Sequence, residues 1–169
     1  MTDTVDADAA FRQVFETTYS RLVAYARRRT ASPSDADDIV SEVYTTAWRR
    51  WDDRTPGRPE LPWLYGIAGN VVRNHRRSSG RRLRLVDRLE AEPAGRAEAD
   101  PADRAGSELR AALDRLSVDD QELLRLVAWE GLSHAEIGEV LGCSTNAVGI
   151  RLHRARQRLQ DQLLSLIHI

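Results

Sequence analysis

The residues best suited to chemistry lie near the end of the 169-residue chain, in the segment GLSHAEIGEVLGCSTNAVGIRLHRARQRL at 131–159. Four arginines and no acidic residue occupy positions 151–158. The planar guanidinium of arginine fits phosphate oxygens and the edge of guanine, and the amide of asparagine fits the edge of adenine. The chemistry that this segment predicts is therefore non-covalent recognition of duplex DNA.

The same segment carries the signals of two helices joined by a tight turn. Ser133 and Glu136 have the spacing of a capping box, and Gly142 permits a sharp turn after the first helix. Ser144 or Thr145 then caps the second helix, whose apolar stripe is Val148, Leu152, Ala155 and Leu159. This arrangement is typical of a helix-turn-helix. The plainer interpretation is a helical hairpin with a polar face.

The surface of the second helix opposite that stripe is the predicted contact with DNA. Successive residues of a helix are about 100° apart, so small and polar residues gather there and arginines flank them. The residues that we expect to contact DNA are Ser144, Thr145, Asn146, Gly149, Ile150, Arg151, His153, Arg154 and Arg156.

The first half of the chain predicts three further helices, over about 9–29, 34–51 and 61–77. Ser34 stands before three acids, which is a helix start signal. The second helix has two adjacent apolar stripes, a wider apolar face than one core contact needs. Prolines and a glycine between 52 and 62 indicate a loop, and the third helix ends in arginine, serine and glycine.

Residues 84–107 lack a periodic pattern, and Ala, Glu, Asp, Arg, Pro and Gly dominate them. This composition is typical of a flexible linker. Positions 73–88 hold seven arginines against one aspartate, whereas 90–108 hold six acids against two arginines. The predicted fold class is all-α, with two small helical domains at 9–83 and 108–163 and a linker at 84–107.

Other classes of function are disfavoured by the sequence. The four histidines lie without the spacing of metal ligands, and the single cysteine excludes an internal disulfide. No glycine-rich phosphate loop and no nucleophile elbow occur, so we expect no cofactor, no metal and no catalysis. No stretch is long and apolar enough for membrane insertion, and the acidic N-terminus is unlike a signal peptide. The expected location is the cytoplasm.

Three segments resemble extracytoplasmic-function sigma factors, in the order and spacing of that family. DADDIVSEVYTTAW at 35–48 is similar to the family's polymerase-binding helix. LPWLYGIAGNVVRNHRR at 61–77 is similar to the helix that reads and opens the −10 element, and the helix-turn-helix is similar to the reader of the −35 element. The resemblance covers residues 10–160 and implies sigma domain 2, a linker and sigma domain 4.

This resemblance implies roles for particular residues. Contacts with core polymerase are expected at Asp35, Asp38, Ile39, Glu42 and Tyr44. Contacts with the −10 element are expected at Asn70, Arg73, Asn74, Arg76 and Arg77. The loop at 53–60 resembles the rest of the pocket for an unpaired base. Trp63 and Tyr65 are the aromatic candidates for stacking on a base. Of these, Trp63 is expected to pack instead, and His75 is also expected to pack rather than to contact bases.

The implied partners are core RNA polymerase, promoter DNA and an anti-sigma factor, which in this family is often anchored in the membrane. Many relatives carry a basic residue early in the recognition helix, where this chain has Asn146, Ala147, Gly149 and Ile150. The family's −35 preference therefore does not carry over. Two alternatives remain open: a stand-alone helix-turn-helix regulator, and an adaptor of helical hairpins that does not bind DNA. The tail at 163–169 is more apolar than an exposed end should be.

Overall fold

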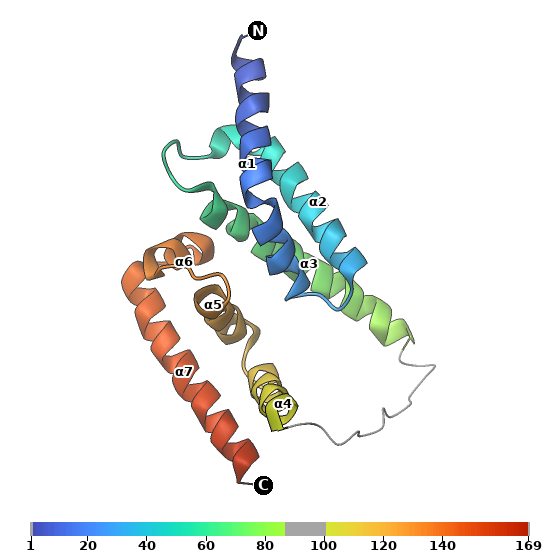
Figure 1. The fold of residues 1–169 in the computed structure, drawn as a ribbon, viewed down its shortest axis with the longest axis vertical. Coiled ribbons are helices and arrows are strands. Elements are labelled where there is room, and N and C mark those ends of the chain that lie inside the picture. Colours follow the sequence, from blue (N-terminus) through green and yellow to red (C-terminus); the bar gives the residue numbers. More distant parts are fainter. Residues whose placement is uncertain (1, 87–100, 169) are drawn as a thin grey trace. The chain divides into compact units, whose positions relative to one another are not determined.

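The computed structural model describes residues 2–86 and 101–168, with side chains at 6–80 and 105–168. Within these residues the chain forms seven α-helices and one 3-10 turn, without a strand (Figure 1). The all-α prediction is confirmed. The chain divides into two compact units, residues 1–90 and 91–169.

The first unit consists of three helices: α1 (Thr2–Arg27), α2 (Pro33–Arg49) and α3 (Glu60–Val86). A 3-10 turn, η1 (Trp51–Asp53), follows α2. Helix α2 packs against both α1 and α3, and Ala36, Val43 and Ala47 are fully buried along it. Tyr25 of α1 and Tyr65 of α3 are also fully buried, and their rings stack with centroids 4.8 Å apart. Tyr65 therefore belongs to the core, which rules out its predicted stacking on a base.

The helix boundaries of this unit differ from the prediction at two places. Ser32, not Ser34, caps α2: its hydroxyl accepts a hydrogen bond of 3.1 Å from the backbone N–H of Asp35. Pro33 then takes the first helical position, where a missing N–H costs nothing. Helix α3 continues past its predicted end at Arg77 to Val86. The Ser78 hydroxyl donates to the carbonyl of His75 at 2.9 Å, a bond within the helix rather than a terminating turn.

The second unit consists of α4 (Pro101–Asp114), α5 (Val118–Ala128), α6 (His134–Leu141) and α7 (Thr145–Ile167). Helix α7 contacts each of the other three, and its buried side chains are those of Val148, Leu152 and Ala155. Both ends of the predicted linker, 84–86 and 101–107, are helical instead. The rest of that predicted linker lies outside the described residues.

The turn between α6 and α7 is closed around two glycines. Gly142 ends α6 with φ +67°, a left-handed conformation that glycine adopts without steric cost. Gly138, one turn earlier, faces the carbonyl oxygen of Cys143, and a Cβ at this position would lie only 2.6 Å from that oxygen. The absence of a side chain at Gly138 therefore lets the turn fold back against α6.

Candidate nucleic-acid interface

Capping interactions fix the two helices of the predicted helix-turn-helix. The Ser133 hydroxyl accepts from the N–H of Glu136 at 3.2 Å, and the Glu136 carboxylate accepts from the N–H of Ser133 at 2.8 Å. Ser144, rather than Thr145, caps α7: its hydroxyl accepts from the N–H of Ala147 at 3.1 Å. Each cap satisfies backbone donors that a helix start otherwise leaves unpaired. The start of α7 is therefore held in a defined conformation.

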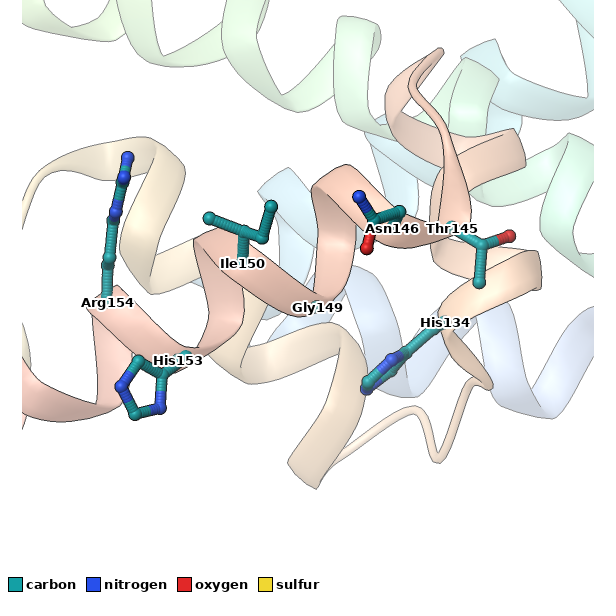
Figure 2. A pocket seen from close by; sticks show the side chains of 7 residues that line it. All are labelled: His134, Thr145, Asn146, Gly149, Ile150, His153 and Arg154. Atoms are coloured by element: carbon teal, nitrogen blue, oxygen red, sulfur yellow. The ribbon is translucent and has the colours of Figure 1, made fainter.

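An open groove follows the first three turns of α7 and the start of α6. Its lining residues are His134, Thr145, Asn146, Gly149, Ile150, His153 and Arg154 (Figure 2). In the view of Figure 2, Ile150 and Arg154 rise from the upper edge of α7, and His153 and His134 lie along its lower edge. Six of these seven residues are ones that the sequence predicted to contact DNA.

His134 is the lining residue that the sequence analysis did not identify. It is the first residue of α6 and is exposed, and a Cβ on Gly149 would lie 3.8 Å from its Nδ1 atom. The turn brings it there from fifteen positions earlier in the chain. No local pattern marks it, since a single histidine after a capping serine is common in helices of any function.

The remaining predicted contacts of α7 lie on its surface. Arg151, Arg154 and Arg156 are exposed, and the Arg151 guanidinium points toward the Cys143 sulfur at 3.9 Å. Arg158 is different, because it donates to the Asp120 carboxylate on α5 at 2.7 Å. Three arginines are therefore exposed for contact with phosphates, while the fourth fixes α7 to α5.

The predicted polymerase-binding residues of α2 divide into a surface group and a buried group. Asp38 and Glu42 are exposed. Ile39 and Tyr44 are only 1% and 6% exposed, so they lie in the core and cannot offer the surface that was expected of them. The Asp35 carboxylate is 3.6 Å from His75 Nε2 on α3, so it joins two helices in addition to facing solvent.

Aromatic side chains fill the surface between α1 and α2. Phe15, Tyr19 and Trp48 are about two-fifths exposed, at 39%, 44% and 43%. Phe15 contacts Tyr44 with ring centroids 4.6 Å apart, and the Tyr44 hydroxyl is 2.8 Å from that of Thr18. Burial raises the pKa of the Tyr44 phenol. The second apolar stripe of α2 is explained by this layer, although the sequence did not indicate which helix it would meet.

The predicted −10 residues lie along the exposed side of α3. Asn70, Arg73, Asn74 and Arg77 are all exposed, and Asn70 Oδ1 accepts a hydrogen bond from Arg73 at 3.2 Å. Arg76 is half-buried and donates to the backbone carbonyl of Arg29 at 3.3 Å. The structure thus brings four of the five to one surface and turns the fifth toward the end of α1.

The loop before α3 is closed by a single arginine. The Arg54 guanidinium lies 3.8 Å from the ring centroid of Trp51 and 3.1 Å from the Glu60 carboxylate. Trp51 also contacts Trp63, at 6.3 Å between ring centroids. Trp63 is only partly buried and belongs to this packing, as the sequence predicted. Arg54 therefore ties the start of the loop to the first turn of α3, a role that the sequence did not indicate.

Two kinds of feature are absent from the part of the chain that the structure describes. None of the helices is long and apolar enough to cross a membrane. Among the same residues, no cluster of three or more histidine, cysteine or acidic side chains is arranged to hold a metal ion.

Known proteins resemble both units. Residues 14–82 match the family model described as Sigma-70 region 2, and residues 107–159 match that described as Sigma-70, region 4. The chain is 35% identical over 168 residues to the ECF RNA polymerase sigma factor SigD of Mycobacterium tuberculosis, covering 92% of this chain and 78% of SigD. It is 34% identical over 148 residues to the ECF RNA polymerase sigma factor SigE of Mycolicibacterium smegmatis, covering 85% of this chain and 57% of SigE.

Solved structures with the same fold are also sigma factors. One is RpoE in complex with the anti-sigma factor NepR from Bartonella quintana, with a TM-score of 0.66, 27% identity, and coverage of 91% of this chain and 96% of that one. Another is CnrH in complex with the cytosolic domain of CnrY, with a TM-score of 0.65 and 28% identity. That match covers 94% of this chain and 90% of the CnrH chain.

Proposed function

This chain belongs to the extracytoplasmic-function group of the sigma-70 family of RNA polymerase sigma factors, and we propose that it directs core RNA polymerase to promoters through a −10 and a −35 element. The observation that carries this proposal is the pairing of two exposed faces in one chain. One is the asparagine- and arginine-bearing side of α3, and the other is the groove on α7. Each face falls within one of the two family matches.

In this proposal α7 enters the major groove of the −35 element. Its first turns carry the groove-lining side chains that meet base edges, and its arginines meet phosphates. The Arg158–Asp120 contact and the buried side of α7 hold the helix at a fixed angle to the rest of the unit. A single unit of this size covers few phosphates, so its affinity for DNA alone is low.

Helix α3 and the loop closed by Arg54 form the −10 site. Opening a promoter requires a base to leave the stack, which costs a few kcal/mol. The amide of Asn70 can donate to and accept from the edge of such a base. Its exposed neighbours Arg73 and Arg77 supply positive charge for the backbone of the opened strand.

Helix α2 serves as the docking surface for core polymerase. Asp38 and Glu42 give it negative charge, and the partly exposed Trp48 gives it an apolar edge. The buried residues Ile39 and Tyr44 support this surface from within the core. Core polymerase would bring both DNA-binding units to one promoter, which raises the effective concentration of the second unit once the first has bound.

We further infer regulation by an anti-sigma factor in the cytoplasm. Two of the solved relatives are RpoE with the anti-sigma factor NepR and CnrH with the cytosolic domain of CnrY. A partner of this kind, often membrane-anchored, would inhibit transcription when added to this chain. The chain itself acts as a specificity subunit of polymerase and carries out no chemical step.

The alternative function is a stand-alone helix-turn-helix regulator. Such a protein needs a dimer to read a palindromic site with half-sites about one helical turn apart. That function would give no role to the segment of α2 that resembles a polymerase-binding helix. Tight binding to a palindrome without polymerase would support the alternative.

Start-site mapping tests the proposed function. The full chain is added to core RNA polymerase and genomic DNA, and the 5′ ends of the transcripts are mapped. The proposal expects new start sites that share two sequence elements at constant spacing and that vanish without the chain. A set of start sites that does not change when the chain is added would refute it.

A further inference from the structure

We propose that α7 reads A·T base pairs within the −35 element, with Ile150 contacting the methyl group of a thymine and Asn146 pairing with an adenine. This inference rests on the proposed function, because it assigns the sequence that the α7 groove selects. It concerns the part of the recognition helix in which this chain departs from the family pattern.

Ile150 is the one aliphatic side chain that lines the groove. It is 47% exposed, although it stands on a helix face that is otherwise polar or small. In the major groove, thymine alone presents an apolar group, its C5 methyl, and aliphatic side chains in the groove contact that methyl. An exposed isoleucine at the centre of this surface therefore fits thymine better than any other base.

Asn146 lines the same groove as Ile150. The two residues are one helical turn apart, a separation of about 6 Å along the axis. Base pairs follow each other about every 3.4 Å along the duplex, so the two side chains reach base pairs one or two steps apart. An asparagine amide pairs with both N6 and N7 of adenine. Together the two residues favour neighbouring A·T pairs.

Gly149 lies between these two residues in the groove lining. A glycine inside a helix costs about 1 kcal/mol relative to alanine. Packing does not explain it here, since the nearest atoms to an added Cβ belong to the exposed His134 ring, at 3.8 Å or more. A position without a side chain between Asn146 and Ile150 lets the helix backbone come close to the bases.

The charge of the groove agrees with this assignment. Of its seven lining residues, Arg154 alone carries a permanent charge, and it lies a turn beyond Ile150. Arginine is the side chain that most often reads guanine. Arg154 is therefore the one lining residue suited to guanine, whereas Asn146 and Ile150 are suited to A·T pairs.

Removal of a single methyl group tests the proposal. The polymerase holoenzyme first selects its preferred −35 element from a randomised library, and each thymine of that element is then replaced by uracil. Uracil pairs as thymine does but lacks the methyl. At one position we expect a loss of about fourfold in competitive promoter binding, the value of one buried methyl group. In Ile150→Ala holoenzyme, thymine and uracil at that position should bind equally.

Val118→Ala is the matched control. Val118 is 58% exposed on α5 and does not line the groove, so its holoenzyme should keep the fourfold difference. A selected element without neighbouring A·T pairs would overturn the inference, as would a uracil effect that persists in Ile150→Ala. Both results leave the proposed function intact. By contrast, a holoenzyme that selects no promoter from the library would refute the proposed function itself.

Discussion

Arg158 of α7 donates a hydrogen bond of 2.7 Å to the carboxylate of Asp120 on α5. The Asp120 side chain is only 12% exposed, whereas that of Arg158 is 57% exposed. The pair therefore gives a nearly buried carboxylate its charged partner, and it holds the recognition helix against the helix behind it. Of the four arginines at 151–158, this one is structural.

Arg158→Ala should destabilise the second unit by about 1 to 3 kcal/mol, because the buried Asp120 carboxylate loses its donor. Arg156→Ala is the matched control, since Arg156 is exposed two positions earlier, and it should stay within about 0.5 kcal/mol. Native-state hydrogen exchange of the α7 amides measures both. Equal protection in the two variants would mean that the Asp120 contact does not stabilise α7.

Two glycines of the helix-turn-helix, Gly138 and Gly149, should respond in opposite directions to alanine. Gly138→Ala places a Cβ 2.6 Å from the Cys143 carbonyl, and such overpacking costs about 1 to 3 kcal/mol. Gly149→Ala meets nothing closer than 3.8 Å, and it should stabilise the helix by about 1 kcal/mol. Urea unfolding gives both free energies. Destabilisation by Gly149→Ala would show that this glycine is needed for folding rather than for DNA.

The second unit could be predicted from sequence in more detail than the first. Capping residues, turn glycines and a 3.6-residue apolar period act within a few positions of one another, and Ser133, Gly142 and Ser144 behave as such local signals predict. His134 was missed because its place beside Gly149 depends on how the turn folds back, which rests on the close approach of Gly138 to Cys143.

The first unit shows what local patterns leave undetermined. Ile39 and Tyr44 were expected at the surface, yet they are buried, because two neighbouring helices cover the wide apolar face of α2. Tyr65 was a candidate for stacking on a base, but it stacks on Tyr25, forty residues away in the sequence. Which apolar residues face a partner and which face the core is decided by tertiary packing.

Tyr44 should make the first unit sensitive to alkaline pH. Burial raises its pKa above the ordinary value of 10.0, so the folded state holds the proton more tightly than the unfolded chain. Its contribution to stability is therefore complete below about pH 10 and is lost as the pH rises through the folded-state pKa. No lysine occurs in the chain and all four tyrosines lie in the first unit, so tyrosine ionisation dominates this range.

Tyr44→Phe should reduce this alkaline loss, while costing about 1 kcal/mol at neutral pH for the hydrogen bond to Thr18. The fully buried Tyr25 and Tyr65 remain in the variant. Tyr19→Phe is the control, because Tyr19 is 44% exposed, and it should keep the alkaline loss. The measurement is the free energy of unfolding from pH 8 to 11. A Tyr44→Phe profile that still falls like the wild type would contradict the assignment.

Phosphate contacts and base contacts of α7 can be distinguished by experiment. Loss of a phosphate contact should change the salt dependence of binding, and loss of a base contact should change the preferred promoter sequence. Arg156→Ala should weaken all promoters alike and reduce the log–log salt slope of holoenzyme binding by about one. His153→Ala should instead change which −35 sequences are preferred. Arg110→Ala, at an exposed arginine of α4 outside the groove, should leave both properties unchanged. An unchanged preference in His153→Ala would mean that α7 is docked differently.

Asn70 should act only once the promoter is open. Asn70→Ala should lower open-complex formation while binding to core polymerase stays unchanged, because the lost contact forms with an unpaired base. Asn74→Ala, one turn along the same exposed side of α3, should have a smaller effect if it meets the strand backbone. A fluorescence assay measures core binding, and permanganate footprinting of unpaired thymines measures open-complex formation. Equal loss in the two assays for Asn70→Ala would make Asn70 a structural residue.

Permanganate reactivity of thymines in the −10 region tests the central claim most directly, because it detects unpaired bases. We predict that reactive thymines occur only when the chain, core polymerase and promoter DNA are all present. Asn70→Ala should reduce the reactivity of these thymines severalfold. Thymines that stay unreactive with all three components present, or that react equally without the chain, would contradict it.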